Sequence, residues 1–145
     1  MNSDLVQQWY EQYKTGIFRF ALSILKDSHL AEDFLQEVFV RLLSGKCMVQ
    51  EGKQQAWLYK VARNLSYDLL RKRNREAEQV AVQNWESYEY IDLIAGLDLT
   101  EREIVTLKIV GGLTHNEIAK VMGISVQAAK KRYERIIQKM REEEL

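Results

Sequence analysis

Basic side chains gather in two short stretches of a chain whose formal net charge is zero. Each stretch, 60–75 and 126–141, holds six Lys or Arg residues and a single acidic residue. Duplex DNA carries about one negative charge per 1.7 Å of axis, so proteins that bind it concentrate cations on the contacting element. The two stretches therefore predict nucleic-acid contacts, with a merely solvated charged helix face as the alternative.

The second basic stretch follows the sequence signals of a helix-turn-helix. Thr114 and Glu117 are spaced as a capping box, Gly123 marks a helix end, and Ser125 can cap the next helix. The second helix of this motif enters the major groove of DNA, and residues near its amino end contact base edges. Because cap, turn and basic helix coincide, the pattern favours DNA binding over a solvated surface.

Aromatic residues lie among polar and cationic ones in and just before the first basic stretch, which predicts a helix from about 54 to 75. Aromatic rings beside cations suit stacking on unpaired bases while the backbone is held electrostatically. The apolar positions predict a core contact through Trp57 or Leu58 and then Val61, Leu65 and Leu69, so core packing is the alternative for some aromatics. The residues of interest are Trp57, Tyr59, Lys60, Arg63, Asn64, Tyr67 and Arg71.

A polar face precedes these stretches in "HLAEDFLQEVFVRLL". Asp33, Gln36 and Glu37 are three and four positions apart and lie opposite the apolar stripe that contains Phe34 and Val38. They offer an acidic surface to a partner. The alternative is that acids near a helix start only complement the helix macrodipole.

The elements that would position these residues are all helical. The chain has 145 residues, no Pro and only 7 Gly, and it shows no strand pattern. We expect an all-α protein of two small helical domains, 1–75 and 90–145, joined by a linker at 76–89. The first domain holds three helices; the second begins with "YIDLIAGL", ending near Gly96, and continues with a helix capped by Thr100 and Glu103.

Several other classes of protein find no support in the sequence. Metal-ligand spacing, a Gly-rich phosphate loop and a nucleophile–base pair are missing, so we expect no enzyme, no metal and no cofactor. His29 and His115 lie far apart at helix starts, where a polar surface role is expected. Cys47 cannot form an internal disulfide, and neither a secretion signal nor a membrane span is present. A cytoplasmic protein without membrane insertion is the expectation.

Three segments in order resemble a known family: "AEDFLQEVF", "WLYKVARNLSYDLLRKR" and "LTEREIVTLKIVGGLTHNEIAKVMGIS". They are similar to regions 2 and 4 of the extracytoplasmic-function (ECF) sigma factors of bacterial RNA polymerase, which belong to group IV of the sigma-70 family. The resemblance spans nearly the whole chain. Taken alone, the second half would also fit the output domain of a LuxR-type response regulator, but the ordered set is specific.

The resemblance implies a function and a role for each surface. The chain would bind core RNA polymerase and promoter DNA, and it would recognise and melt promoters; an anti-sigma factor is a further partner that the family suggests. The polymerase contact would comprise Asp33, Gln36, Glu37 and Arg41. The minus-ten element would meet Trp57, Tyr59, Lys60, Arg63, Asn64 and Arg71. The minus-thirty-five element would meet Thr114, Ser125, Gln127, Lys130, Lys131 and Arg135.

Two other functions are weighed against this one. The first is a sigma-like helix-turn-helix regulator that does not itself support initiation or needs a second chain, and a run-off transcription assay separates it from a sigma factor. The second is an anti-sigma or adaptor protein, for which two separate basic helices have no purpose.

Overall fold

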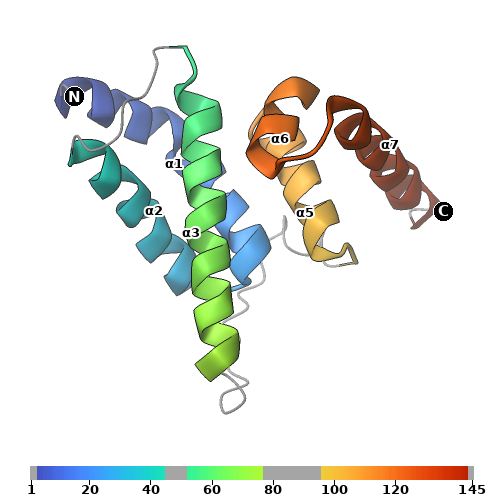
Figure 1. Cartoon of the computed structure of the whole chain (residues 1–145), viewed down its shortest axis with the longest axis horizontal. Coiled ribbons are helices and arrows are strands. Elements are labelled where there is room, and N and C mark those ends of the chain that lie inside the picture. Colours follow the sequence, from blue (N-terminus) through green and yellow to red (C-terminus); the bar gives the residue numbers. More distant parts are fainter. Residues whose placement is uncertain (1–2, 45–51, 77–95, 144–145) are drawn as a thin grey trace.

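The computed structural model describes residues 3–44, 52–76 and 96–143, and every regular element in these ranges is a helix (Figure 1). The all-α fold class predicted from the sequence is confirmed for this part of the chain. The elements are α1 (Ser3–Leu25), α2 (Ser28–Leu43), α3 (Gln54–Glu76), α5 (Leu99–Val105), the π-helix η2 (Thr106–Val110), α6 (His115–Met122) and α7 (Val126–Glu143).

Helices α1, α2 and α3 form the first domain. Their apolar stripes meet in a core that includes Ile17, Phe20, Leu42 and Leu58, each fully buried. Burial of a side chain of this size contributes about 1.5–3 kcal/mol. The turn between α1 and α2 is closed by Asp27, whose carboxylate accepts hydrogen bonds from the backbone N–H groups at the start of α2.

Helix α3 is covered on two flanks, which changes the expected burial pattern. Leu58 is buried and Trp57 is only partly buried, so Leu58 is the core residue of this pair. The most buried positions along α3 are Leu58, Tyr59, Ala62 and Ser66. They fall between the two coverings, because α3 packs against α1 and α2 on one side and against the second domain on the other (Figure 1).

The second domain comprises α5, η2, α6 and α7 around a small core. Its fully buried side chains include Ile104, Leu107, Leu113 and Ile118. The capping box of Thr114 and Glu117 is present, as predicted. These contacts fix the start of α6.

The capping box predicted for Thr100 and Glu103 is wrong. Asp98 and Glu101 form that box instead, and α5 begins at Leu99. Thr100 already lies inside the helix, and Glu103 is buried against the first domain. Asp is at least as good a cap as Thr, and it lies three residues before a Glu, so the earlier pair forms the box.

Some predictions fall on residues that the structure does not describe: the linker beyond Glu76, the helix proposed before Gly96, and Cys47. Within the described ranges, none of the helices combines the length and apolar character needed to cross a bilayer.

Candidate nucleic-acid interface

The turn between α6 and α7 sets the direction of α7. Gly123 ends α6 with a left-handed backbone (φ 69°), a conformation that costs glycine little. The N–H of Ile124 donates to the carbonyl of Ala119 at 3.0 Å, and the Ser125 hydroxyl accepts from the N–H of Ala128 at 3.1 Å. The structure thus contains the predicted helix-turn-helix, with Ser125 as the cap of its second helix.

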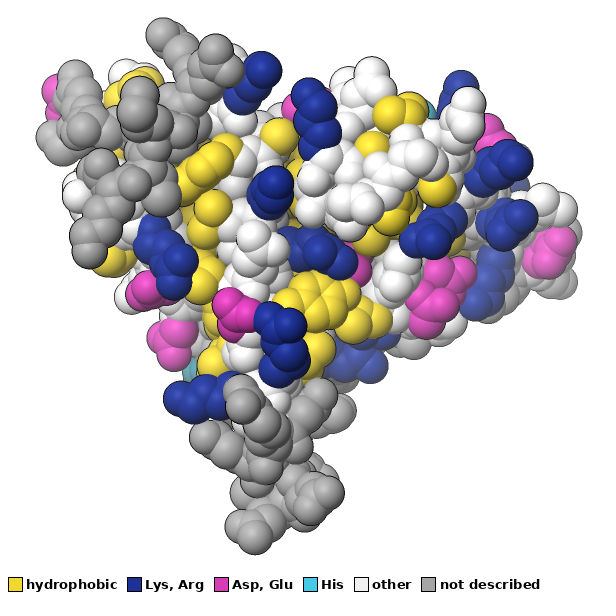
Figure 2. Space-filling model, in the orientation of Figure 1, with side chains coloured by type: hydrophobic (Ala, Val, Ile, Leu, Met, Phe, Trp, Pro, Cys, Tyr) yellow, Lys and Arg dark blue, Asp and Glu magenta, His cyan; other side chains and the backbone are white. Residues whose placement is uncertain are grey.

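The side chains of α7 divide by direction. Ala129 and Ile136 are buried against the rest of the second domain. The predicted DNA-contacting residues of this helix and its cap all lie exposed on the other side: Ser125, Gln127, Lys130, Lys131 and Arg135. Figure 2 shows Lys and Arg side chains gathered over α7. A basic, solvent-facing helix that follows a tight turn has the geometry required for insertion into a major groove.

Two residues at the start of α6 lie beside this surface. Thr114 is exposed, and its hydroxyl accepts a hydrogen bond from the N–H of Glu117. His115 is partly buried, with its ring centroid 5.6 Å from that of Tyr133. Desolvation, followed by the nearby Lys108 and Lys130, lowers the pKa of His115. The imidazole therefore packs as a largely neutral ring rather than serving as a purely surface group.

The predicted DNA-contacting residues of α3 differ in their exposure to solvent. Lys60, Asn64 and Arg71 are exposed, and Arg71 pairs with Asp68 on the same helix. Tyr59 is only 1% exposed, because its ring packs against Phe20 inside the first domain and against Gly111 of the second. In this arrangement of the domains Tyr59 is part of the core. Trp57 is partly exposed.

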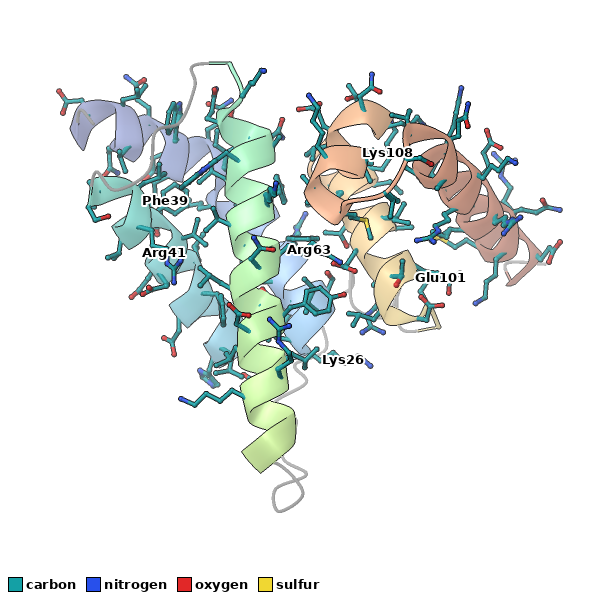
Figure 3. The ribbon with its side chains drawn as sticks, in the orientation of Figure 1. Lys26, Phe39, Arg41, Arg63, Glu101 and Lys108 are labelled. Atoms are coloured by element: carbon teal, nitrogen blue, oxygen red, sulfur yellow. The ribbon has the colours of Figure 1, made fainter. Side chains whose placement is uncertain are left out.

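Arg63 makes a contact that sequence reasoning did not anticipate. Its Nε donates to Oε1 of Glu103 at 2.7 Å, and the Tyr67 hydroxyl donates to Oε2 of the same carboxylate, also at 2.7 Å. The Arg63 guanidinium lies 4.7 Å from the centre of the Tyr67 ring. Figure 3 shows Arg63 on the flank of α3 that faces α5. A hollow beside this contact is lined by Arg63, Asn64, Tyr67, Asp68 and Arg71.

Burial controls the electrostatics of this contact. The Glu103 side chain has no exposed surface, and desolvation raises its pKa despite the opposing effects of Tyr67 and Arg63. Desolvation also raises the pKa of the Tyr67 hydroxyl well above its usual range, and the hydrogen bond to Glu103 adds to that rise. Arg63 keeps 25% of its side chain exposed. The contact is therefore a hydrogen-bonded ion pair at the edge of the buried interface between the two domains.

The acidic face of α2 is exposed, as its pattern indicates. Asp33, Gln36, Glu37 and Arg41 all face solvent, and Glu37 pairs with Arg41 at 3.5 Å. Figure 3 shows Arg41 and Phe39 on this helix.

An apolar groove between α1 and α2 adjoins that face, and sequence reasoning missed it. Val40 and Leu43 are each 56% exposed, and both line one groove, so they form an exposed apolar patch rather than isolated surface residues. The only available sequence signal is that both positions lie off the buried stripe of α2. The groove is lined by Val6, Gln7, Tyr10, Gln36, Phe39, Val40 and Leu43.

Comparison with known proteins identifies the family of the chain. Residues 9–76 match the family Sigma-70 region 2, and residues 87–140 match Sigma-70 region 4. The chain is similar to the ECF RNA polymerase sigma factor SigM of Bacillus subtilis (strain 168), with 33% identity over 135 residues that cover 83% of each protein. It is 26% identical to the ECF sigma factor SigE of Mycolicibacterium smegmatis, over 90% of this chain and 58% of that protein.

The fold has a counterpart among solved structures. The sigma factor RpoE of Bartonella quintana, determined in complex with the anti-sigma factor NepR, superimposes with a TM-score of 0.81 at 22% identity, over 97% of this chain and 96% of that one. The two family matches place both sigma regions in order along the chain, and the helix-turn-helix lies within the second. The chain belongs to the ECF sigma factors of the sigma-70 family, the promoter-specificity subunits of bacterial RNA polymerase.

Proposed function

We propose that three surfaces of this chain divide the work of promoter recognition: α7 contacts the minus-thirty-five element, α3 contacts the minus-ten element, and α2 contacts core RNA polymerase. The observation that carries the proposal is the exposed basic face of α7. This helix is the second of a helix-turn-helix whose first helix, α6, is capped at both ends. Its cations stand on a rigid element, so they can address one groove of DNA in one register.

The α3 surface suits the strand-separated part of a promoter. Lys60, Asn64 and Arg71 are exposed on it, and Arg63 and Tyr67 stand beside them. Cations can follow a phosphate backbone while an aromatic ring stacks on an unpaired base. Trp57, partly exposed near the start of the helix, supplies a second ring for such stacking.

The α2 surface suits a protein partner. Asp33, Gln36, Glu37 and Arg41 are exposed on it, and Gln36 also lines the apolar groove that contains Val40 and Leu43. A patch of exposed apolar side chains with a polar rim is typical of protein–protein interfaces. Acids in the rim would orient a basic partner surface and speed its association.

The remaining expectations follow from the family. A sigma subunit positions DNA on an enzyme and catalyses no reaction itself, so this chain would act without a catalytic residue or cofactor. It would work in the cytoplasm, where bacterial transcription takes place. Since the structural relative from Bartonella quintana was solved with an anti-sigma factor, we propose a protein of that class as a further partner.

Run-off transcription with purified core RNA polymerase tests the proposed function. The wild-type chain should confer initiation on a promoter selected from its own genome. Reversing the charge of α2 with Asp33→Lys and Glu37→Lys should weaken core binding by tenfold or more, because close charge pairs at interfaces contribute about 1.5–7 kcal/mol. Both residues are exposed, so the helix content measured by circular dichroism should not change.

A matched control reverses two exposed acids elsewhere, Glu134 and Glu142 of α7, and measures core binding without DNA. These reversals should leave the affinity for core enzyme within about threefold, a small fraction of the interfacial coupling expected for α2. Equal losses in both double variants would contradict the assignment of α2. Failure of the wild-type chain to support initiation would instead indicate a helix-turn-helix regulator.

A further inference from the structure

The Glu103 carboxylate engages two donors of α3, Arg63 and Tyr67, that line the hollow on the proposed DNA-contacting surface. It accepts from the Arg63 guanidinium and from the Tyr67 hydroxyl, each at 2.7 Å, and it is completely buried. Arg63 therefore donates its Nε–H to an anion of the second domain. A carboxylate and a phosphate each present two anionic oxygens to an arginine, so both can accept its hydrogen bonds.

Other contacts hold the second domain in the position that places Glu103 there. Arg102, the neighbouring residue, donates through Nε to the carbonyl of Ser23 in α1 at 2.8 Å and is buried. The Gln55 amide donates to the carbonyl of Gly111. These bonds tie α5 and the end of η2 to both α1 and α3, so the Glu103 contact belongs to a specific docked arrangement.

The close approach at Gly111 reinforces this specificity. A Cβ atom added there would lie 3.1 Å from the Tyr59 ring and 2.8 Å from the side chain of Leu113. Only glycine lets the backbone of the second domain approach the Tyr59 ring so closely. Apolar residues of the two domains consequently form one continuous core cluster, from Phe20 and Tyr59 to Leu107 and Leu113.

We infer that Glu103 is an internal competitor for DNA: its carboxylate takes the place of a DNA phosphate on Arg63 and Tyr67 whenever the two domains are docked. The inference rests on the proposed DNA contact of α3. Docking and DNA binding at this site compete, because the Arg63 Nε–H and the Tyr67 hydroxyl cannot be donated to Glu103 and to a phosphate at the same time. By linkage, DNA that occupies α3 disfavours docking to the same extent that docking weakens DNA binding.

The energetics of the contact suit a reversible competitor. Burying a charged pair costs desolvation energy that its mutual attraction often fails to exceed. Separation of the domains returns Glu103 and Arg63 to solvent and recovers that cost, while it exposes apolar surface around Tyr59. Packing therefore stabilises the docked state. The ion pair between Glu103 and Arg63 forms only when no DNA phosphate occupies these donors of α3.

Charge reversal separates this inference from a purely structural role. Glu103→Lys would bury a second cation against Arg63, so the full-length chain should open, and its radius of gyration from small-angle X-ray scattering should rise. Arg63→Glu should open the chain as well, by placing two carboxylates together. The double variant Arg63→Glu/Glu103→Lys restores opposite charges and should return the radius of gyration toward that of the wild type.

Glu11→Lys is the matched control, because Glu11 is an exposed acid of α1 that pairs with Lys14 on its own helix. It makes the same charge change and should leave the chain compact. Arg63→Glu disrupts the same contact from the first domain, so it tests the inference even if Glu103→Lys misfolds the second domain. Thermal unfolding of each variant shows whether it is folded. A compact Arg63→Glu variant, or a charge swap that stays open, would overturn the inference.

The competition itself is measured with a fluorescent 12-nucleotide single strand of random sequence. Glu103→Lys should bind it at least about fivefold more tightly than Glu11→Lys does, the lower end of ordinary coupling between sites. If Glu103→Lys opens the chain but binds the strand no better than the control, the competition is wrong; run-off transcription by the wild type remains a separate test of the proposed function.

Discussion

The exposed side chains in the first turns of α7 differ in chemistry, so we expect them to make different contacts with DNA. Gln127 is uncharged and exposed, and an amide can bind an adenine edge through two hydrogen bonds; Lys130 can bind a guanine. We predict that Gln127→Ala or Lys130→Ala costs about 1–3 kcal/mol at one base position and relaxes the preference there. Titration of the chain against duplexes that vary one position of the minus-thirty-five element measures this effect.

Arg135 supplies the comparison within the same helix. It is exposed more than a turn beyond Lys130, so we expect it to meet a phosphate. Arg135→Ala should weaken all sequences alike and lower the slope of log affinity against log salt by about one. If Gln127→Ala leaves the preference unchanged while Lys130→Ala and Arg135→Ala behave identically, α7 contributes only electrostatic attraction.

Residue contacts also explain what the sequence could and could not predict. Thr114 caps α6 through a hydrogen bond that spans three residues, so local spacing predicts it. The same spacing rule selects Thr100 and Glu103 wrongly, because it cannot compare two overlapping capping boxes. The partner of Glu103 is Arg63, 40 positions earlier in the chain, and no local pattern encodes that pairing.

At the scale of elements, the helix-turn-helix depends on the backbone of Gly123. Its φ of 69° lies in the left-handed region, which costs residues with a Cβ about 1–2 kcal/mol. Its Cβ position is open, so strain alone should decide the effect of a substitution. We predict that Gly123→Ala destabilises the second domain by about 1 kcal/mol, measured as a shift of the urea unfolding midpoint.

Gly123→Asn is the control for this prediction, because asparagine tolerates the left-handed conformation better than alanine does. It should lose less stability than Gly123→Ala, although its side chain is larger. Equal losses from both substitutions would show that the turn does not depend on this backbone conformation.

The π-helix η2 illustrates an element that sequence patterns do not reveal. The N–H of Gly111 bonds to the carbonyl of Thr106 at 2.9 Å, one residue further back than in an α-helix. The Leu107 side chain is fully buried, and Gly111 closely approaches Tyr59. The extra residue in the turn thus accompanies contacts between domains, whereas the sequence suggests only a helix that ends at two glycines.

At the scale of the whole molecule, the arrangement of the domains decides which surfaces are available. The second domain covers Tyr59 and engages Arg63, while α7 and the α2 face remain exposed. On the proposed roles of these surfaces, minus-thirty-five DNA and polymerase can bind the docked state. Donation by both Arg63 Nε and the Tyr67 hydroxyl to minus-ten DNA would require the domains to separate. This order follows from tertiary contacts that are nonlocal in sequence, which is why periodicity could define the helices but not their docking.

The docked arrangement should depend on pH through Glu103. Burial raises the pKa of this carboxyl in the docked state, against the lowering effects of Tyr67 and Arg63 on α3 and of Arg102 beside it. The docked state therefore binds a proton more tightly than the separated state, where Glu103 is solvated and its pKa is ordinary. Docking should be favoured as pH falls toward the ordinary pKa of Glu, about 4.3, and this added stability should fade as pH rises through the docked-state value.

Sedimentation velocity of the full-length chain measures this effect as a change in frictional ratio. The measurement covers about pH 5 to pH 8, which lies above the ordinary pKa of Glu. The wild type should become more compact toward the acidic end. Glu103→Gln keeps the shape of the side chain but cannot titrate, so its frictional ratio should lose that pH dependence. Glu11→Gln, at an exposed position, should respond as the wild type does. If Glu103→Gln and the wild type compact to the same extent, other acids govern the pH response, and the carboxyl of Glu103 is not what couples protons to docking.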